Sequence, residues 1–246
     1  MRLTAEVALV GGGALGLGLT HAADSHVYLI DGGEALALVD VGTGLATDRL
    51  LAVVRADGYD PARIRVAFLT HPHADHAGGA RSIRDGTGAA IAAAPETAGF
   101  LQAADERGFN LDAARAAGRY PAEYRLAACE VEQELTDDQE VPVGRLRVRV
   151  IRTPGHSTGG LCFWVRGGDR SYLFTGDTLF FGGKVLTLAT DDCSVPALRD
   201  SIACLLQLEV DALLPGHLMF TLWGGRAHVA AADTIFRRLG VPPNIL

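Results

Sequence analysis

The 246-residue sequence predicts a mixed α/β fold in which two β-sheets pack face to face and helices cover their outer surfaces. Hydrophobic residues make up 48% of the chain, enough to fill a large core. Short apolar segments with glycine turns occur in two separate series, and each series is accompanied by amphipathic helical patterns. Between the two series, residues 96–127 are rich in alanine and charge. We therefore expect a single domain over residues 1–246 with a helical insertion at about 96–127.

The first series contains five short apolar segments. A hairpin turn, Asp31-Gly32-Gly33, separates two of them, which is typical of antiparallel neighbours. A helix is predicted over residues 48–56, with Thr47 as its cap and Gly58 just beyond its end. The predicted strands are residues 6–10, 27–30, 36–39, 65–70 and 89–93.

The second series begins with a strand in which arginines and aliphatic residues alternate over residues 145–150, so that one face is apolar. A helix over residues 195–206 is predicted, with Ser194 as its cap and Pro196 in its first turn. The other predicted elements are strands at 161–165, 172–175 and 212–214 and a helix at 226–239.

Composition argues against several classes of protein. The net charge is −7 and the basic residues form no cluster, so we expect no nucleic-acid partner. No apolar run is long enough to span a bilayer, and five glycines interrupt the apolar residues 8–20, so we expect neither a membrane segment nor a signal peptide. Cys162 and Cys204 lie in apolar runs and are expected to be core thiols in a reducing cytoplasm.

The strongest chemical signal is the segment His71-Pro72-His73-Ala74-Asp75-His76, directly after a predicted buried strand. The whole chain has only eight histidines, so three within six residues are improbable by chance. In an extended segment His71 and His73 point the same way, and Asp75 and His76 then turn towards a second position. Imidazole and carboxylate ligands suit zinc, iron or manganese.

Three later segments share one design, in which an apolar strand ends, a glycine follows or ends it, and a ligand-type residue comes next. These residues are His156, Asp177 and His217. Loops at the ends of rigid strands are common positions for functional side chains. The four segments together therefore predict one metal site.

This ordered set of His and Asp residues resembles the metallo-β-lactamase superfamily, and Asp177 and His217 make it more similar to the glyoxalase II-like hydrolases. The resemblance implies a four-layer αββα sandwich. It also implies that Asp177 bridges two metal ions and that Asp40 supports the site from behind. On the basis of this resemblance, we assign catalytic roles to Asp75 and Asp177. The implied metal ligands are His71, His73, Asp75, His76, His156, Asp177 and His217.

The implied cofactors are two divalent metal ions, with zinc as the first choice and iron or manganese as alternatives. A metal-bridging hydroxide would attack the carbonyl of a small ester-like substrate, either a thioester or a lactone. A mononuclear iron dioxygenase acting on persulfides, or a non-catalytic scaffold of the same fold, are the rival functions. We expect a small-molecule substrate, and we leave open whether the chain forms a homodimer.

Two further residues are pocket candidates. His26 occupies a position where related enzymes often carry a polar residue facing the site, and Lys184 could contact a substrate carboxylate. The sequence differs from the pattern of a full glyoxalase II, because the 29 residues after His217 contain three arginines and no lysine, and we expect no glutathione-binding domain there. A G-x-G-x-x-G pattern at residues 11–16 is expected not to bind a dinucleotide, since glycines there oppose a helix.

Overall fold

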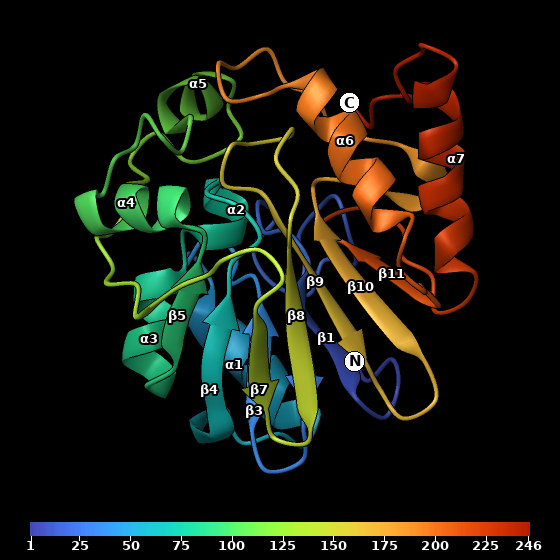
Figure 1. Ribbon diagram of the computed structural model, residues 1–246. Helices are drawn as coiled ribbons and strands as arrows, with labels where there is room; N and C mark the ends of the chain where they lie inside the picture. Colours follow the sequence, from blue (N-terminus) through green and yellow to red (C-terminus); the bar gives the residue numbers. More distant parts are fainter. The chain divides into compact units, whose positions relative to one another are not determined.

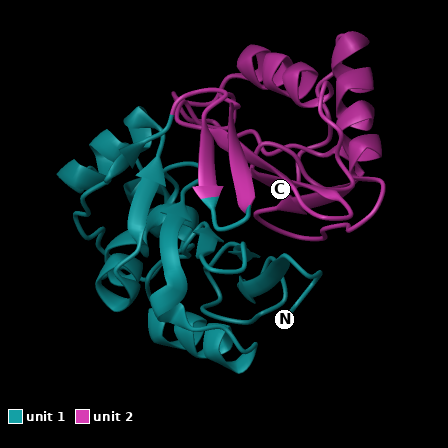
Figure 2. Cartoon of the chain, turned by 60° about the horizontal axis from the view of Figure 1, so that its bottom comes forward, with its two compact units in different colours: residues 1–135, 143–145 teal, residues 136–142, 146–246 magenta.

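The computed structural model describes residues 1–246 and divides into two compact units, coloured separately in Figure 2. Unit 1 contains residues 1–135 and 143–145, and unit 2 contains residues 136–142 and 146–246. Each unit has its own β-sheet and helices, whose elements are labelled in Figure 1. The organisation as one domain over residues 1–246 stays a prediction.

Unit 1 contains a six-stranded sheet in the order β1-β2-β3-β4-β5-β6. The first two pairings are antiparallel, and β3, β4, β5 and β6 pair in parallel. Its strands are β1 (Val7–Gly11), β2 (Val27–Asp31), β3 (Leu36–Val39), β4 (Ile64–Phe68), β5 (Ala90–Ala93) and β6 (Gln133–Glu134). The parallel strands β3 and β4 end at the same edge, so the residues that follow each of them can meet there.

Helices cover one face of this sheet. Alternate strand residues such as Leu36 and Leu38 pack in one cluster with Leu50 and Val54 of α1 (Thr47–Ala56) and Ile83 of α3 (Ala80–Thr87). The remaining elements are the 3₁₀ turn η1 (Pro61–Arg63), the short helix α2 (Ala74–Ala77), α4 (Pro95–Ala103) and α5 (Leu111–Ala116). The predicted insertion is thus two short helices, α4 and α5, followed by turns and irregular chain.

Unit 2 contains a five-stranded sheet in the order β11-β10-β9-β8-β7. Strands β8, β9 and β10 pair antiparallel, and β10 pairs with β11 in parallel. The strands are β7 (Glu140–Val143), β8 (Leu146–Arg152), β9 (Leu161–Arg166), β10 (Ser171–Gly176) and β11 (Ala212–Pro215). Because β10 and β11 are parallel, the residues after both strands emerge at one edge.

Two helices pack on the sheet of unit 2. Leu198, Ile202 and Leu205 of α6 (Val195–Leu205) recur at helical spacing and join the core cluster with Leu173 of β10. The second helix is α7 (Gly225–Arg237), which supplies Val229, Ala232 and Phe236, and a 3₁₀ turn, η2 (Phe181–Gly183), precedes both. Ser194 caps α6 by accepting a hydrogen bond from the Ala197 backbone N–H, as predicted.

Most predicted elements are confirmed within two residues, with three differences. Thr47 lies inside α1 and donates to the Gly44 carbonyl, so the predicted cap is wrong. Cys204 is exposed, because the α6 stripe that includes Ile202 turns it away from the core. The short strand β6 and the strand β7 were not predicted, since neither is a continuous apolar run.

Residues 12–20 form turns and no helix, whereas a dinucleotide-binding G-x-G-x-x-G pattern opens a helix. No helix of the structure combines the length and the apolar character needed to cross a membrane.

The α6 packing can be tested with Ile202→Ala, which removes a fully buried side chain. We expect a loss of about 2–5 kcal/mol in the free energy of unfolding of unit 2. Both tryptophans, Trp164 and Trp223, belong to unit 2, so their fluorescence during urea unfolding reports on it. Cys204→Ala on the exposed face is the control and should change stability by less than about 0.5 kcal/mol. Equal losses for both variants would contradict the described orientation of α6.

Candidate metal centre

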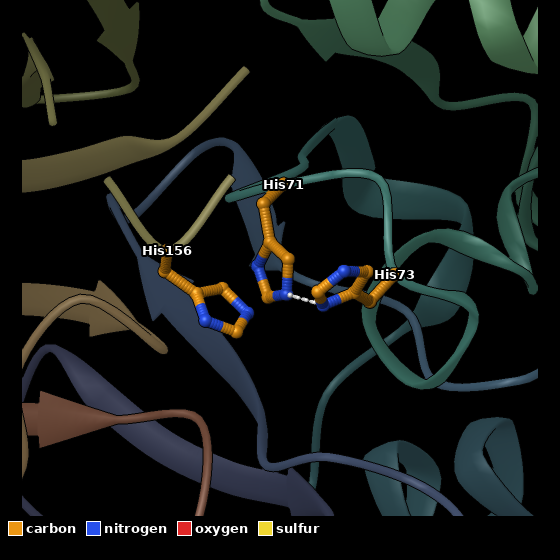
Figure 3. Close-up of side chains that lie close together, drawn as sticks. All are labelled: His71, His73 and His156. Atoms are coloured by element: carbon orange, nitrogen blue, oxygen red, sulfur yellow. Dashed lines mark hydrogen bonds between the residues drawn. The ribbon is translucent and has the colours of Figure 1, made fainter. Parts of the chain in front are cut away.

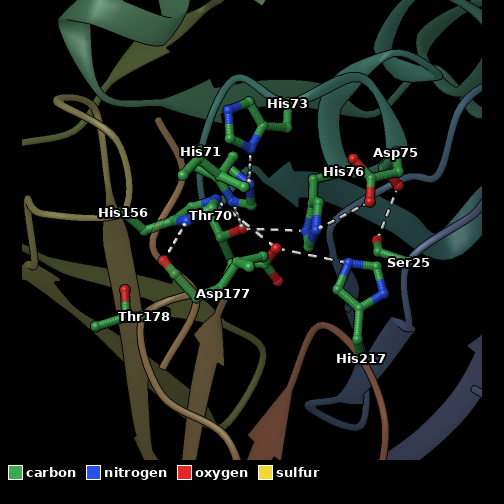
Figure 4. A network of polar contacts seen from close by, with 12 residues as sticks. Ser25, Thr70, His71, His73, Asp75, His76, His156, Asp177, Thr178 and His217 are labelled. Carbon is green, nitrogen blue, oxygen red and sulfur yellow. Dashed lines mark hydrogen bonds and ion pairs between the residues drawn. The ribbon is translucent and has the colours of Figure 1, made fainter. Parts of the chain in front are cut away.

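In unit 1, the candidate ligands follow strand β4 within one tight segment. His71 and His76 are buried and His73 is nearly so, while Asp75 is partly exposed. The backbone N–H of His76 donates to the carbonyl of His73, which begins the short helix α2. The turn brings Asp75 and His76 to neighbouring positions, with 3.6 Å between Asp75 Oδ2 and His76 Nε2 (Figure 4).

A buried carboxylate lies behind these histidines. Asp40 is 2% exposed and follows strand β3, next to β4. Its Oδ1 accepts from the Thr70 backbone N–H at 2.8 Å, and its Oδ2 lies 2.7 Å from His76 Nδ1. A buried carboxylate needs such partners, because its desolvation would otherwise be too costly. The bond to Asp40 places the hydrogen of His76 on Nδ1 and directs its Nε2 lone pair away from Asp40.

Asp40 has a backbone φ of 61°, in the left-handed region. Among non-glycine residues, aspartate and asparagine adopt this region most readily. Strained backbone of this kind clusters at functional sites, where the surrounding bonds maintain it. The conformation agrees with the supporting role that the family resemblance implies for Asp40.

Thr70 connects Asp40 to a second histidine. Its Oγ1 lies 2.9 Å from Asp40 Oδ2, 3.0 Å from Asp40 Oδ1 and 2.9 Å from His71 Nδ1. The single hydroxyl hydrogen is donated to the carboxylate, so Oγ1 accepts from a hydrogen on His71 Nδ1. This tautomer leaves the His71 Nε2 lone pair available as a ligand. Sequence reasoning missed Thr70, although its position directly before His71 was a usable signal.

The first two histidines of the motif direct different nitrogens towards one point. His71 Nε2 lies 3.1 Å from His73 Nδ1 (Figure 3). Two nitrogens ~2.0–2.1 Å from one tetrahedral zinc ion are separated by a little more than 3 Å. The pair is therefore spaced as two ligand atoms of a single ion would be.

In unit 2, His156 follows strand β8 in a turn that requires glycine. Gly155 has φ 139°, and a Cβ at this position would overlap the backbone of Leu198. His156 is buried, and its Nδ1 donates to the Leu186 carbonyl at 2.9 Å. The hydrogen on Nδ1 leaves Nε2 as the ligand atom, as in many metal sites where a backbone carbonyl orients the imidazole.

Asp177 and His217 come from the ends of the parallel strands β10 and β11. Asp177 Oδ2 lies 3.7 Å from His156 Nε2 and 3.6 Å from His217 Nε2, so one oxygen faces both imidazoles (Figure 4). The Gly216 backbone N–H donates to the Gly176 carbonyl, which holds the two loops together. The ring of Phe180 lies nearly parallel to that of His217, with 6.5 Å between centroids.

These side chains fit divalent metal ions. All seven candidates belong to groups of histidines and aspartates that could hold an ion. The donor atoms are nitrogens and oxygens, which suit zinc, iron or manganese, and their number exceeds the four of a closed structural zinc site. Three of the histidines have their other nitrogen held by protein groups, an orientation that metal ligands commonly need. The histidines and aspartates present are therefore compatible with divalent metal.

A family model described as the metallo-β-lactamase superfamily matches residues 22–217, which include every candidate ligand. The chain belongs to this superfamily. The match agrees with the two sheets and helices described above and confirms the predicted fold class. Among solved structures, a metallo-β-lactamase from Cronobacter sakazakii with a mutated HARLDQ motif has a TM-score of 0.74 at 21% identity, covering 97% of this chain and 95% of that one.

The curated proteins that are similar in sequence to this chain include hydrolases and thioesterases. A hydroxyacylglutathione hydrolase of Rhodospirillum rubrum is 29% identical over 160 residues, covering 65% of this chain and 50% of the relative. An acyl-coenzyme A thioesterase, MBLAC2, of Bos taurus is 25% identical over 233 residues, covering 88% of this chain and 80% of the relative. The chain spans about half the length of the hydroxyacylglutathione hydrolases that it matches.

The two pocket candidates have different environments. His26 is buried, and its ring lies so close to the backbone of Gly16 that a Cβ at position 16 would overlap it. Burial, and then the charge of Asp40, raises the pKa of Tyr28, so the Tyr28 hydroxyl remains a donor to His26 Nδ1 at 3.2 Å. Lys184 is exposed just after the turn η2. The roles of His26 and Lys184 in a pocket stay predictions.

The hydroxyl of Thr70 can be tested with Thr70→Val, which keeps the shape of the side chain but cannot accept from His71. We expect the affinity for zinc to fall about ten- to a hundredfold, the usual effect of removing a partner that orients a ligand. A titration against a chromogenic chelator measures the change. Thr70→Ser keeps the hydroxyl and should retain most of the affinity; an unaltered affinity in Thr70→Val would refute the assigned role.

Proposed function

We propose that the chain is a dinuclear metal-dependent hydrolase that cleaves a small thioester. In this proposal Asp177 is shared by both ions. The first ion is bound by His71, His73 and His156, and the second by Asp75, His76 and His217. Zinc is the metal we favour, with iron or manganese as alternatives.

The observation that carries the proposal is the orientation of the histidines by their other nitrogen. Thr70 holds His71, Asp40 holds His76, and a backbone carbonyl holds His156. Such partners are unnecessary for a scaffold that binds nothing, but they set the tautomer of a metal ligand. The superfamily match spans the donors of both units, which supports treating them as one centre.

Two divalent ions at these donors would supply an activated water molecule and an electrophile for the substrate carbonyl. The chain contributes fixed geometry. A single oxygen of Asp177, Oδ2, lies near the ligand nitrogens of both His156 and His217. The bonds to Asp40 and Thr70 prevent His76 and His71 from rotating, so little reorganisation is needed during the reaction.

The thioester is favoured over the lactone by the activities for which the relatives are named. One is a hydroxyacylglutathione hydrolase, and another is an acyl-coenzyme A thioesterase whose match covers 88% of this chain.

We propose that exposed Lys184 contacts a negatively charged group of the thiol portion of the substrate. All four cysteines are free thiols in the structure, which supports a reaction in the cytoplasm.

Metal content and activity together test this function. We expect about two transition-metal ions per chain by elemental analysis, and hydrolysis of acyl thioesters that exceeds any hydrolysis of lactones. Removal of metal with a chelator should abolish the activity, and zinc should restore it. One iron per chain with oxygen uptake on a persulfide would establish the dioxygenase instead, and a metal-free protein would support the scaffold.

The shared ligand can be tested with Asp177→Asn. The amide has nearly the same size but lacks the negative charge, so we expect about one metal equivalent and a loss of at least ~100-fold in kcat. The matched control is Asp200→Asn, because Asp200 is an exposed residue of α6 paired only with Arg199. The control should keep full activity. Two metal equivalents and normal turnover in Asp177→Asn would disprove the bridging assignment.

A further inference from the structure

The predicted insertion contacts the metal-binding segment of unit 1 through two tyrosines. Tyr120 and Tyr124 follow helix α5, and their rings stack with 5.4 Å between centroids and 29° between planes. The Tyr120 hydroxyl donates to Asp75 Oδ1 at 2.9 Å, and the Tyr124 hydroxyl donates to the Thr43 carbonyl at 2.7 Å. Only the first of these two bonds reaches a candidate ligand.

Tyr124 fastens the insertion to the loop. It is 6% exposed, and a Cβ at Gly78 would overlap its hydroxyl. Gly78 follows the helix α2 that carries Asp75 and His76, so the absence of a side chain there permits the close approach. The docking of Tyr124 also places the stacked Tyr120 ring beside α2.

The two carboxylate oxygens of Asp75 have different surroundings. Oδ1 accepts from Tyr120, whereas Oδ2 lies 3.6 Å from His76 Nε2. A hydrogen bond to one oxygen limits rotation of the carboxylate about its terminal bond. Tyr120 therefore keeps Oδ2 directed towards the same side as the His76 ligand nitrogen.

The backbone at Asp75 is held independently. Its carbonyl accepts from the Ser25 hydroxyl at 2.8 Å and from the Ser25 backbone N–H at 3.1 Å. With the backbone anchored by Ser25, the remaining freedom of Asp75 lies in its side chain. That freedom is what the bond from Tyr120 restricts.

The segment that carries the tyrosines is anchored within the insertion. Arg115 of α5 donates to the Tyr124 carbonyl at 2.7 Å and pairs with Glu106, also at 2.7 Å. Glu106 in turn accepts from the Leu126 backbone N–H at 3.1 Å. Arg115 is only 14% exposed at its side chain, so this pair is less screened than a surface ion pair.

We propose that Tyr120 is a positioning residue for the second metal ion and that the helical insertion sets the affinity for this ion through the bond to Asp75. The inference rests on the proposed function, in which Asp75 binds the second ion. His76, the other unit 1 ligand of this ion, is oriented by Asp40 within the sheet core, so Asp75 is the ligand whose orientation depends on the insertion.

The test is a zinc titration of the full chain against a chelator, comparing Tyr120→Phe with Tyr124→Phe. Phenylalanine keeps the stacked ring in both variants, so each loses one hydroxyl and one hydrogen bond. We expect Tyr120→Phe to weaken the second equivalent of zinc about ten- to a hundredfold and to leave the first unchanged. Tyr124→Phe should change the second equivalent by less than about threefold, because the stacked ring and the bond from Arg115 to the Tyr124 carbonyl remain and its hydroxyl contacts no ligand.

A second measurement separates positioning from a general loss of structure. In a chain that already carries Asp75→Ala, adding Tyr120→Phe should not weaken zinc binding further, since the carboxylate that it orients is gone. An additional loss in that background would overturn the inference.

The outcomes also distinguish this inference from the function on which it rests. Two tight zinc sites that are equally strong in wild type and Tyr120→Phe would overturn the role of Tyr120 and leave the dinuclear hydrolase standing. A wild-type chain that binds a single zinc ion would overturn both. A weakened first equivalent with an unchanged second one would likewise refute the assignment of Tyr120 to the second ion.

Discussion

The buried carboxylate of Asp40 is the constraint on which the arrangement of the candidate ligands in unit 1 depends. It is almost completely removed from solvent, so its charge must be balanced by hydrogen bonds. Thr70 and His76 supply them, and through Thr70 the same carboxylate orients His71. A single desolvated charge thus determines which nitrogen of two histidines is presented as a ligand. The strained backbone of Asp40 is maintained by these bonds.

Unit 2 orients its ligands by different means. His156 is held by a backbone carbonyl, and the turn before it requires glycine because the Leu198 backbone lies too close for a side chain. Asp177 and His217 are brought together by parallel strands that end at one edge. Candidate ligands are therefore oriented mainly by backbone geometry in unit 2 and by a buried side-chain network in unit 1. Both arrangements reduce the rearrangement needed when a ligand binds.

The superfamily match includes every candidate donor but does not identify the substrate. Residues 22–217 carry the match, and the chain covers only half of several relatives, so the substrate class remains a proposal. The helical segment after β5 contacts the metal-binding segment of unit 1 through Tyr120, whose hydroxyl donates to the candidate ligand Asp75.

The sequence by itself determined most strands, the main helices and the candidate ligands, because these are encoded by short-range patterns such as alternation and close His/Asp spacing. Only the tertiary structure revealed Tyr120, which lies 45 positions from Asp75, and the bonds of Thr70 to Asp40, 30 positions apart. The tertiary structure also showed that Cys204 lies on the exposed face of its helix. The physical reason is that a ligand is recognised by its own chemistry, whereas a supporting partner is defined by a contact that only folding creates.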